Sequence, residues 1–264
     1  MRKLMFVTMM MASVYMTLAH DMWLESDQFR GKVGEEFVLR LGNGTIFEIS
    51  ENAVQPARVE VVSAIWPGGG IHAVTGAVVE GNWLTLRFQP EEPGNFWITL
   101  GTKPRLIQLS AADFNSYLEH DGLPHVLTER QEKGILDRAE VEEYSKFVKT
   151  YLQVGTKTSE NYAVPAGLKI EIIPLENPYQ LHPGQELPLR ALFNGAPLEG
   201  FLVHSGCASC EGSTAAPYTD ARGETAVTLS QPGRWYLRGI HLLQVDQQDH
   251  SYESYWASVT FEVQ

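Results

Sequence analysis

The chain has 264 residues, of which 44% are hydrophobic and 20% are charged, and its formal net charge is −12. This composition is typical of a folded chain of one or two domains and excludes a disordered one. The acidic balance argues against a nucleic-acid partner, because phosphate binding requires clustered Lys and Arg.

Residues 1–19 have the layout of a secretory signal peptide. Arg2 and Lys3 precede an apolar run, and Thr17 and Ala19 occupy the −3 and −1 positions of a cleavage site. The apolar run is shorter than the ~20 residues of a membrane span. We therefore expect cleavage after Ala19, export to the periplasm and no stable membrane insertion of the mature chain. An uncleaved anchor is the alternative.

Residues 20–109 show the alternation of short β-strands. Phe37, Leu39 and Leu41 alternate with polar residues, and similar patterns recur downstream. The turn signals GNG, PGGG, EGN and EEPGN separate these stretches. We expect an antiparallel β-sandwich domain over residues 20–109.

Residues 110–165 are predicted to form a helical connecting segment. Ser110 has a capping-box-like context, and Phe114 and Leu118 lie one helical turn apart. A second helix, ending near Gly155, is predicted from apolar residues at helical spacing, namely Val141, Tyr144, Val148 and Tyr151. The charged residues between them are assigned to a solvated face: Glu142, Glu143, Lys146 and Lys149.

Strand patterns return in residues 166–264. Leu187, Leu189 and Ala191 alternate with other residues ahead of an NG turn at 194–195. We expect a C-terminal immunoglobulin-like β-sandwich domain over residues 166–264. The predicted fold class is mainly β, with two immunoglobulin-like antiparallel β-sandwich modules bridged by a short helical segment.

The common catalytic templates are absent from the sequence. It contains no GxSxG elbow, P-loop, HExxH or GxGxxG motif. We therefore expect a protein that is not an enzyme and has no catalytic residues.

His20 would be the first residue of the mature chain after cleavage at Ala19. It would then carry a free α-amine beside its imidazole, and the two nitrogens can chelate one metal ion. Imidazole suits copper, nickel, zinc and cobalt. The alternative is a charged terminus beside a strand.

Three further histidines are candidate ligands. His120 and His125 lie in EHDGLPHVL and are close enough in sequence to reach one site. His241 shares a strand face with Trp235 and Leu237. A histidine on such a face is more often a core residue than a ligand, so both interpretations stay open.

The two cysteines form a local motif with a histidine. His204, Cys207 and Cys210 give H-x-x-C-x-x-C. A structural zinc site normally needs four ligands, and an exported protein favours a Cys207–Cys210 disulfide. A second metal or redox site is the alternative.

Several stretches together resemble the domain-of-unknown-function 4198 family over nearly the whole mature chain. They include AHDMWLE after the signal peptide, FNSYLEHDGLPHVL, GLKIEIIPLENPYQLHPGQELPLRALFNGAPLEG and PGRWYLRGIHL. Members are often described as periplasmic components of nickel or cobalt uptake systems. The family pattern has histidines that correspond to His20, His125 and His241, and the resemblance implies that these three meet around a metal. The H-x-x-C-x-x-C motif is not part of that pattern.

The leading hypothesis is a periplasmic transition-metal-binding protein that serves metal uptake or delivery, with an inner-membrane transporter as partner. Nickel or cobalt follows from the resemblance, and copper suits an amine-plus-imidazole site. His20 would chelate through both nitrogens, His125 and His241 would complete the shell, and His120 would be the substitute.

Two alternatives have different signatures. A non-metal binding or adaptor module of the cell envelope would expose aromatic side chains from among Trp23, Trp66, Trp83 and Trp97. A copper oxidoreductase using the same N-terminal histidine would need an open coordination position.

Overall fold

The computed structural model describes residues 20–264, so the expected signal peptide lies outside the described part of the chain. Strands dominate, and two α-helices, α1 (Ala111–His120) and α2 (Pro124–Glu132), accompany them. The prediction of a mainly β protein is confirmed. Within residues 20–264 neither helix is long and apolar enough to cross a membrane.

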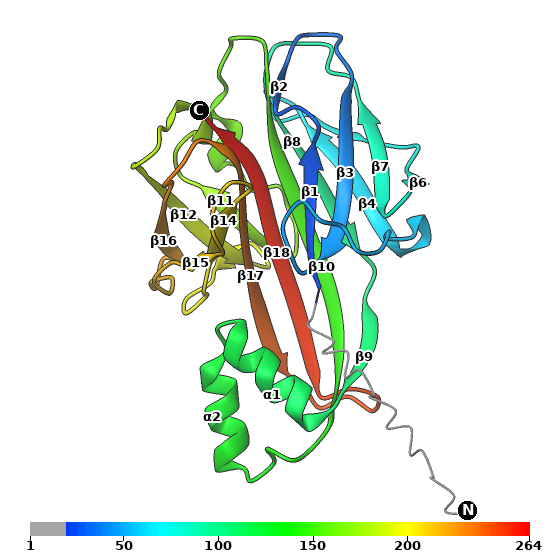
Figure 1. Ribbon diagram of the computed structural model, residues 1–264, viewed down its shortest axis with the longest axis vertical. Coiled ribbons are helices and arrows are strands. Elements are labelled where there is room, and N and C mark those ends of the chain that lie inside the picture. The colour runs from blue at the N-terminus through cyan, green and yellow to red at the C-terminus, as the bar shows by residue number, and fades with distance from the viewer. Residues whose placement is uncertain (1–19) are drawn as a thin grey trace, which may run out of the picture.

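Ten strands form one large sheet (Figure 1). They are β2 (Arg30–Gly31), β4 (Val59–Ile65), β5 (Ile71–Ala73), β8 (Gly94–Thr102), β9 (Arg105–Leu109), β10 (Glu140–Val154), β14 (His204–Cys207), β15 (Thr214–Ala215), β17 (Gly233–Gln244) and β18 (Tyr252–Val263). The order is β15-β14-β17-β18-β10-β8-β4-β5, and β2 and β9 also pair with β10. The long strands β10, β17 and β18 therefore form the centre of the molecule.

Two four-stranded sheets cover the large one. The first contains β1 (Asp21–Ser26), β3 (Phe37–Gly44), β6 (Val78–Glu80) and β7 (Trp83–Phe88). The second contains β11 (Ile170–Pro174), β12 (Glu186–Phe193), β13 (Ala196–Pro197) and β16 (Glu224–Thr228). Short 3-10 turns lie at Pro56–Arg58, Glu160–Ala163 and Pro178–Gln180. Each small sheet forms a sandwich with part of the large one.

The side chains of β10 alternate between these two sandwiches. Val148 and Leu152 belong to the core with the first small sheet. Tyr151 belongs to the core formed with the second small sheet, and Phe147 packs against the same core. Because successive side chains of a strand point to opposite faces, one strand serves both cores. The two small sheets accordingly lie on opposite faces of the large sheet.

The helix predicted for residues 141–155 is wrong, because this segment is strand β10. Its apolar residues fit a helical period, but they also fit two opposite strand faces that are both buried. Glu142, Lys146 and Lys149, which were assigned to a solvated face, are only 3%, 4% and 1% exposed. The modules are joined by a continuous sheet, and the segment 110–165 is α-helical only in α1 and α2.

The buried charge of Lys149 has a partner. Its Nζ lies 3.1 Å from Oε2 of Glu171 on β11 and 4.5 Å from the ring centroid of Trp97 on β8. Burial lowers the pKa of Lys149, and the charge of Glu171 opposes this effect. A paired charge of this kind is tolerated in a core, whereas an unpaired one is not.

The helices pack on the ends of β17 and β18. Helix α1 begins after Ser110 as predicted, and the Ser110 hydroxyl accepts a hydrogen bond from the Asp113 N–H at 3.1 Å. Phe114 and Leu118 are fully buried and share a core with Trp256 of β18. The second helix, α2, therefore lies earlier in the chain than the sequence pattern predicted.

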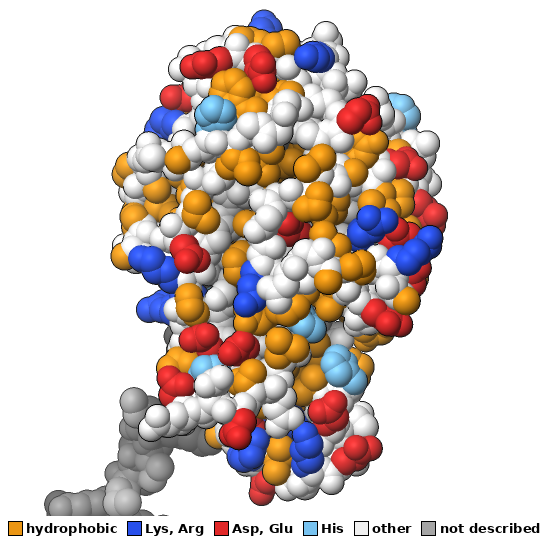
Figure 2. Space-filling model, turned by 180° about the vertical axis from the view of Figure 1, so that it is seen from behind, with side chains coloured by type: hydrophobic (Ala, Val, Ile, Leu, Met, Phe, Trp, Pro, Cys, Tyr) orange, Lys and Arg blue, Asp and Glu red, His pale blue; other side chains and the backbone are white. Residues whose placement is uncertain are grey.

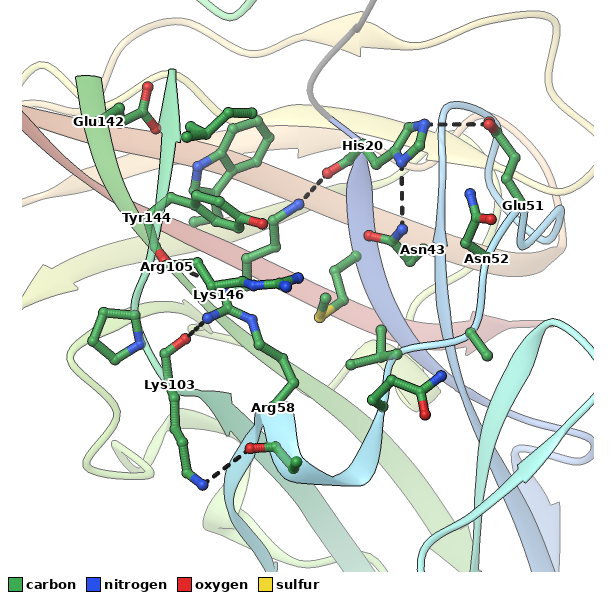
Figure 3. A pocket seen from close by; sticks show the side chains of 18 of the residues that line it. His20, Asn43, Glu51, Asn52, Arg58, Lys103, Arg105, Glu142, Tyr144 and Lys146 are labelled. Atoms are coloured by element: carbon green, nitrogen blue, oxygen red, sulfur yellow. Dashed lines mark hydrogen bonds and ion pairs between the residues drawn. The ribbon is translucent and has the colours of Figure 1, made fainter. Parts of the chain in front are cut away.

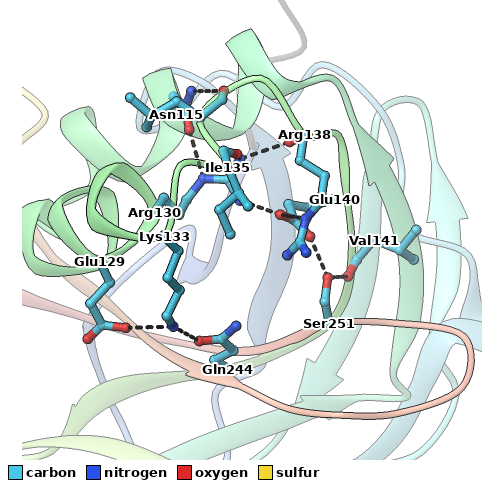
Figure 4. Close-up of polar contacts among 11 residues, drawn as sticks. Asn115, Glu129, Arg130, Lys133, Ile135, Arg138, Glu140, Val141, Gln244 and Ser251 are labelled. Atoms are coloured by element: carbon cyan, nitrogen blue, oxygen red, sulfur yellow. Dashed lines mark hydrogen bonds and ion pairs between the residues drawn. The ribbon is translucent and has the colours of Figure 1, made fainter.

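Arg130 connects both helices to the start of β10 (Figure 4). Its guanidinium donates to Asn115 Oδ1 at 2.9 Å and to the carbonyls of Ile135 and Arg138 at 2.9 and 2.8 Å. It also donates to the carboxylate of Glu140. Arg130 is 0% exposed, so these bonds replace its hydration completely.

We expect Arg130→Met to lower the free energy of unfolding by about 3–5 kcal/mol, because Glu140 would keep a buried charge without its main partner. Chemical denaturation monitored by circular dichroism measures this loss. Lys133→Met, at the C-cap of the same helix, is the control, since its ion pair with Glu129 is exposed and should contribute less than ~1 kcal/mol. Equal losses in the two variants would contradict the prediction.

Candidate functional site

A pocket of about 900 Å³ lies beside the start of β1 (Figure 3). Its walls come from His20, the β3–β4 connection, the β8–β9 turn, α1, β10 and β18. In Figure 3, His20, Asn43 and Glu51 lie at one side and Arg58, Lys103 and Arg105 lie across the pocket from them. Both the N-terminal sandwich and the helical end of the large sheet therefore contribute to it.

The imidazole of His20 is held by two side chains of the first sandwich. Its Nε2 lies 3.2 Å from Oε2 of Glu51, and its Nδ1 lies 3.4 Å from the amide nitrogen of Asn43. The carbonyl of His20 accepts a hydrogen bond from Lys146 Nζ. Ring and backbone of His20 are thus both positioned at the edge of the pocket.

Glu51 orients this ring. Hydrogen bonds from the Thr45 hydroxyl and N–H, at 2.7 and 2.8 Å, lower the pKa of Glu51, and His20 contributes in the same direction. The ionised carboxylate accepts a hydrogen bond from Nε2–H, and the Asn43 N–H then donates to Nδ1. The lone pair of Nδ1 accepts this hydrogen bond, so a ligand that binds Nδ1 would displace the Asn43 amide.

Lys146 lies at the floor of the pocket with an aromatic surround. Its Nζ is 4.6 Å from the ring centroid of Trp256 and 5.7 Å from that of Tyr144. Burial lowers its pKa to about 8, although the charge of Asp21 opposes this effect. Cation–π contacts and a carbonyl stabilise the ammonium in place of water.

Two other buried polar groups face the same pocket. Glu142 accepts a hydrogen bond from Ser254 through Oε1, but its Oε2 has no partner among the described residues. The hydroxyl of Tyr117 also has none. Burial raises the pKa of Glu142 to about 7. Buried polar atoms without partners are uncommon in folded proteins and indicate groups available to a ligand.

The structure does not bring the three predicted histidines together. His241 lies on the β17 face that carries Trp235 and Leu237, and its ring packs 4.6 Å from that of Phe193 on β12. His20 lies on the opposite side of the sheet, where β1 packs. Within residues 20–264, the one group of three metal-ligating side chains found contains neither His20 nor His241.

His125 and His120 also lie apart from His20. His125 is exposed at the start of α2. Burial lowers the pKa of His241, and the nearby His125 lowers it further. His120 is exposed at the end of α1, where Nδ1 donates to the Ser116 carbonyl at 2.7 Å. His125 and His241 are therefore neighbours of each other but do not line the pocket of His20.

The H-x-x-C-x-x-C residues do not form one site. Cys207 and Cys210 are joined by a disulfide. His204 and Cys207 lie three residues apart on strand β14, so their side chains point to opposite faces of it. Burial lowers the pKa of His204 to about 4, and its neighbour across the strands is Arg238.

A group that the sequence did not single out lies at the start of β10 and β18, with Glu143 on the strand face opposite to Glu142. Ligand atoms of Glu143, His250 and Glu253 come within 4.8 Å of one another. The parallel pairing of Glu143 with Glu253 brings these side chains together. A hydrogen bond to Asp249 raises the pKa of His250 against the effect of burial.

The sequence model of a family described as "Domain of unknown function (DUF4198)" matches residues 17–242. The chain belongs to this family. The resemblance stated from the sequence is confirmed, and the matched range includes His20 and most of the pocket. No curated protein matches the chain.

Solved structures match the DUF4198 chain at low sequence identity and low TM-score. A DUF4785 family protein from Legionella pneumophila is 11% identical, with 81% of this chain and 50% of that chain covered and a TM-score of 0.25. Salmonella alpha-2-macroglobulin is 12% identical, with 91% and 15% covered and a TM-score of 0.27. The D0-D1 domain of intimin is 12% identical, with 91% and 97% covered and a TM-score of 0.22. The chain thus spans half or less of the first two proteins.

Replacing Glu142 by Gln should make the protein more stable at high pH. The unfolded carboxyl loses its proton near pH 4.5, whereas the folded one keeps it to about pH 7, so ionisation destabilises the native chain as pH rises. We expect a gain on the order of 3 kcal/mol near pH 8 and little change near pH 4, because one pKa unit corresponds to about 1.4 kcal/mol.

Urea denaturation at the two pH values measures this difference. Glu60→Gln, at an exposed position of β4, is the control and should leave the stability unchanged at both. A gain for Glu142→Gln that is the same at both pH values would contradict the assigned cause.

Proposed function

We propose that the mature protein is a periplasmic transition-metal-binding protein that serves metal uptake or delivery through an N-terminal chelate at His20. The observation that carries the proposal is the contact between His20 Nε2 and the Glu51 carboxylate, at 3.2 Å. It engages Nε2, so that Nδ1, the ring nitrogen nearer the backbone, contacts only the Asn43 amide and lies beside a terminal amine that cleavage after Ala19 would create.

The donor set fits a transition metal of the nickel, cobalt and copper group. Amine and imidazole nitrogens suit these ions, and the two together form a small chelate ring. Metal-bound histidines commonly donate their other ring N–H to a carboxylate, which fixes the ring and raises its basicity. Glu51 would have this role for His20.

The chelate differs from the one expected from the sequence. His125 and His241 do not reach it, so the protein would supply two nitrogens and leave other coordination positions open to the pocket. Such an incomplete set suits capture and release more than permanent storage. Transfer to an inner-membrane transporter is the proposed next step.

The adaptor alternative receives less support. Trp23 and Trp97 are 0% and 1% exposed, and Trp66 and Trp83 are only partly exposed. These four tryptophans therefore do not form the exposed aromatic surface that this alternative requires.

Metal affinity should depend on the first residue of the chain. Protein beginning at His20 should bind nickel(II), whereas protein retaining Ala19 should bind it much more weakly, because the backbone nitrogen of His20 is then part of a peptide bond. Calorimetric titration measures both affinities. Glu51→Gln should weaken binding by about tenfold, as expected for a partner that orients a ligand.

Two histidine variants serve as controls. His241→Ala should leave nickel affinity unchanged, since this residue lies on the opposite sheet face. His250→Ala removes the ligand of the other cluster and should also have no effect. If His250→Ala abolishes binding and the Ala19 extension does not, the metal binds at Glu143, His250 and Glu253 and the proposal is overturned.

A further inference from the structure

The pocket beside His20 is far larger than a single metal ion requires. A metal ion and its ligand atoms need a site only a few ångströms across. A pocket of about 900 Å³ is instead in the size range of small-molecule sites. The aromatic rings of Tyr117, Tyr144 and Trp256 line part of it. Its size and walls indicate an organic ligand.

The charge of the pocket is opposite to that of the protein. Four basic side chains line it, those of Arg58, Lys103, Arg105 and Lys146, against two carboxyl groups, those of Glu51 and Glu142. The chain as a whole carries a net charge of −12. On the face seen in Figure 2, by comparison, acidic and basic side chains are interspersed. A local excess of positive charge in an acidic protein indicates selection for an anion.

None of these four cations has a carboxylate partner within 4.0 Å among residues 20–264, although ten other Lys and Arg residues there do. Arg58 donates to the carbonyls of Lys103 and Tyr144. Lys103 and Lys146 likewise donate only to carbonyls, those of Ala57 and His20.

The floor of the pocket adds polar groups that are almost completely buried, and two of their atoms lack partners. Lys146 is 4% exposed and Glu142 is 3% exposed. Oε2 of Glu142 and the hydroxyl of Tyr117 lack partners within the described chain. Buried polar groups normally have hydrogen-bond partners, so these atoms are poised for the polar groups of a ligand.

We propose that the pocket binds a small organic polycarboxylate, held by Arg58, Arg105 and Lys146, which also occupies the metal coordination positions that His20 leaves open. This inference deepens the proposed function and rests on it for the metal's part. The ligand taken up would then be a metal chelate of an organic acid, with His20 binding the metal and the basic residues binding the carboxylates.

The geometry suits such a bridging ligand. His20 and the basic residues lie on different sides of one pocket (Figure 3), so a single molecule can contact both. Arginine guanidinium groups bind carboxylates through paired N–H donors, and such charge-assisted bonds are among the stronger polar contacts. Carboxylate oxygens are also ligands for divalent metals.

Citrate is the probe, and calorimetric titration of protein beginning at His20 is the measurement. Three titrations are compared: citrate alone, nickel(II) alone and an equimolar mixture of nickel(II) and citrate. We expect citrate to bind alone, and the mixture to bind more tightly than either component. Arg105→Gln is the first variant, because its exposed side chain makes no hydrogen bond or ion pair within residues 20–264 and its loss leaves the fold intact.

Arg105→Gln should weaken binding of citrate and of the mixture by at least about tenfold, since a charge-assisted hydrogen bond to a carboxylate is lost. Binding of nickel(II) alone should change less than about twofold. Arg58→Gln should act in the same direction. Lys157→Gln, an exposed lysine outside the pocket, is the charge-matched control and should change none of the three titrations.

The outcomes separate the two proposals. If nickel(II) binds at His20 but citrate does not bind and does not change its affinity, the polycarboxylate site is overturned and the metal site stands. If citrate binds and Arg105→Gln weakens it while nickel(II) never binds, the metal site and the bridging ligand are overturned. Citrate binding that is equal in Arg105→Gln, Arg58→Gln and Lys157→Gln overturns the assignment to this pocket.

Discussion

The pairing of β10 with strands of both modules is the constraint on which the rest of the structure depends. It runs parallel to β18 from Glu142 to Thr150 and antiparallel to β8 and β9 at its two ends. Because its side chains alternate between two cores, a shift of register by one residue would exchange every buried group between them. The buried pair of Lys149 and Glu171 would be separated by the same shift, so charge as well as packing specifies the register.

The same strand produces the pocket. Successive residues on one face of β10 change from apolar near Leu152 to charged at Lys146 and Glu142. This change occurs where the first small sheet ends and the helices begin. The apolar part of the face packs against β1 and β3, while the charged part remains uncovered by a sheet. A cavity with buried charges is the result, and the carbonyl of His20 closes one side of it.

Local patterns predicted much of the fold and less of the site. The strands, the Ser110 helix start and the family were all evident, because they depend on short-range periodicity or motifs. Residues 141–154 were misassigned because a strand buried on both faces loses the period of two that marks a strand. The pocket residues come from six separate segments, so only tertiary structure joins Arg58 to Lys146. The alternation of side chains along β17 also places His241 on the face of the sheet opposite to His20. The separation of the two residues in the sequence does not reveal this.

The division of the pocket walls between the halves of the molecule has a thermodynamic consequence. His20 and Arg58 belong to the N-terminal sandwich, whereas Tyr117 and Trp256 belong to the helical end. A molecule that fills the pocket therefore binds only when both parts are docked, and by mass action its binding free energy is added to their association. Ligand binding would make the unfolding of the two halves more cooperative. The protein without ligand would unfold in less coupled steps than the complex.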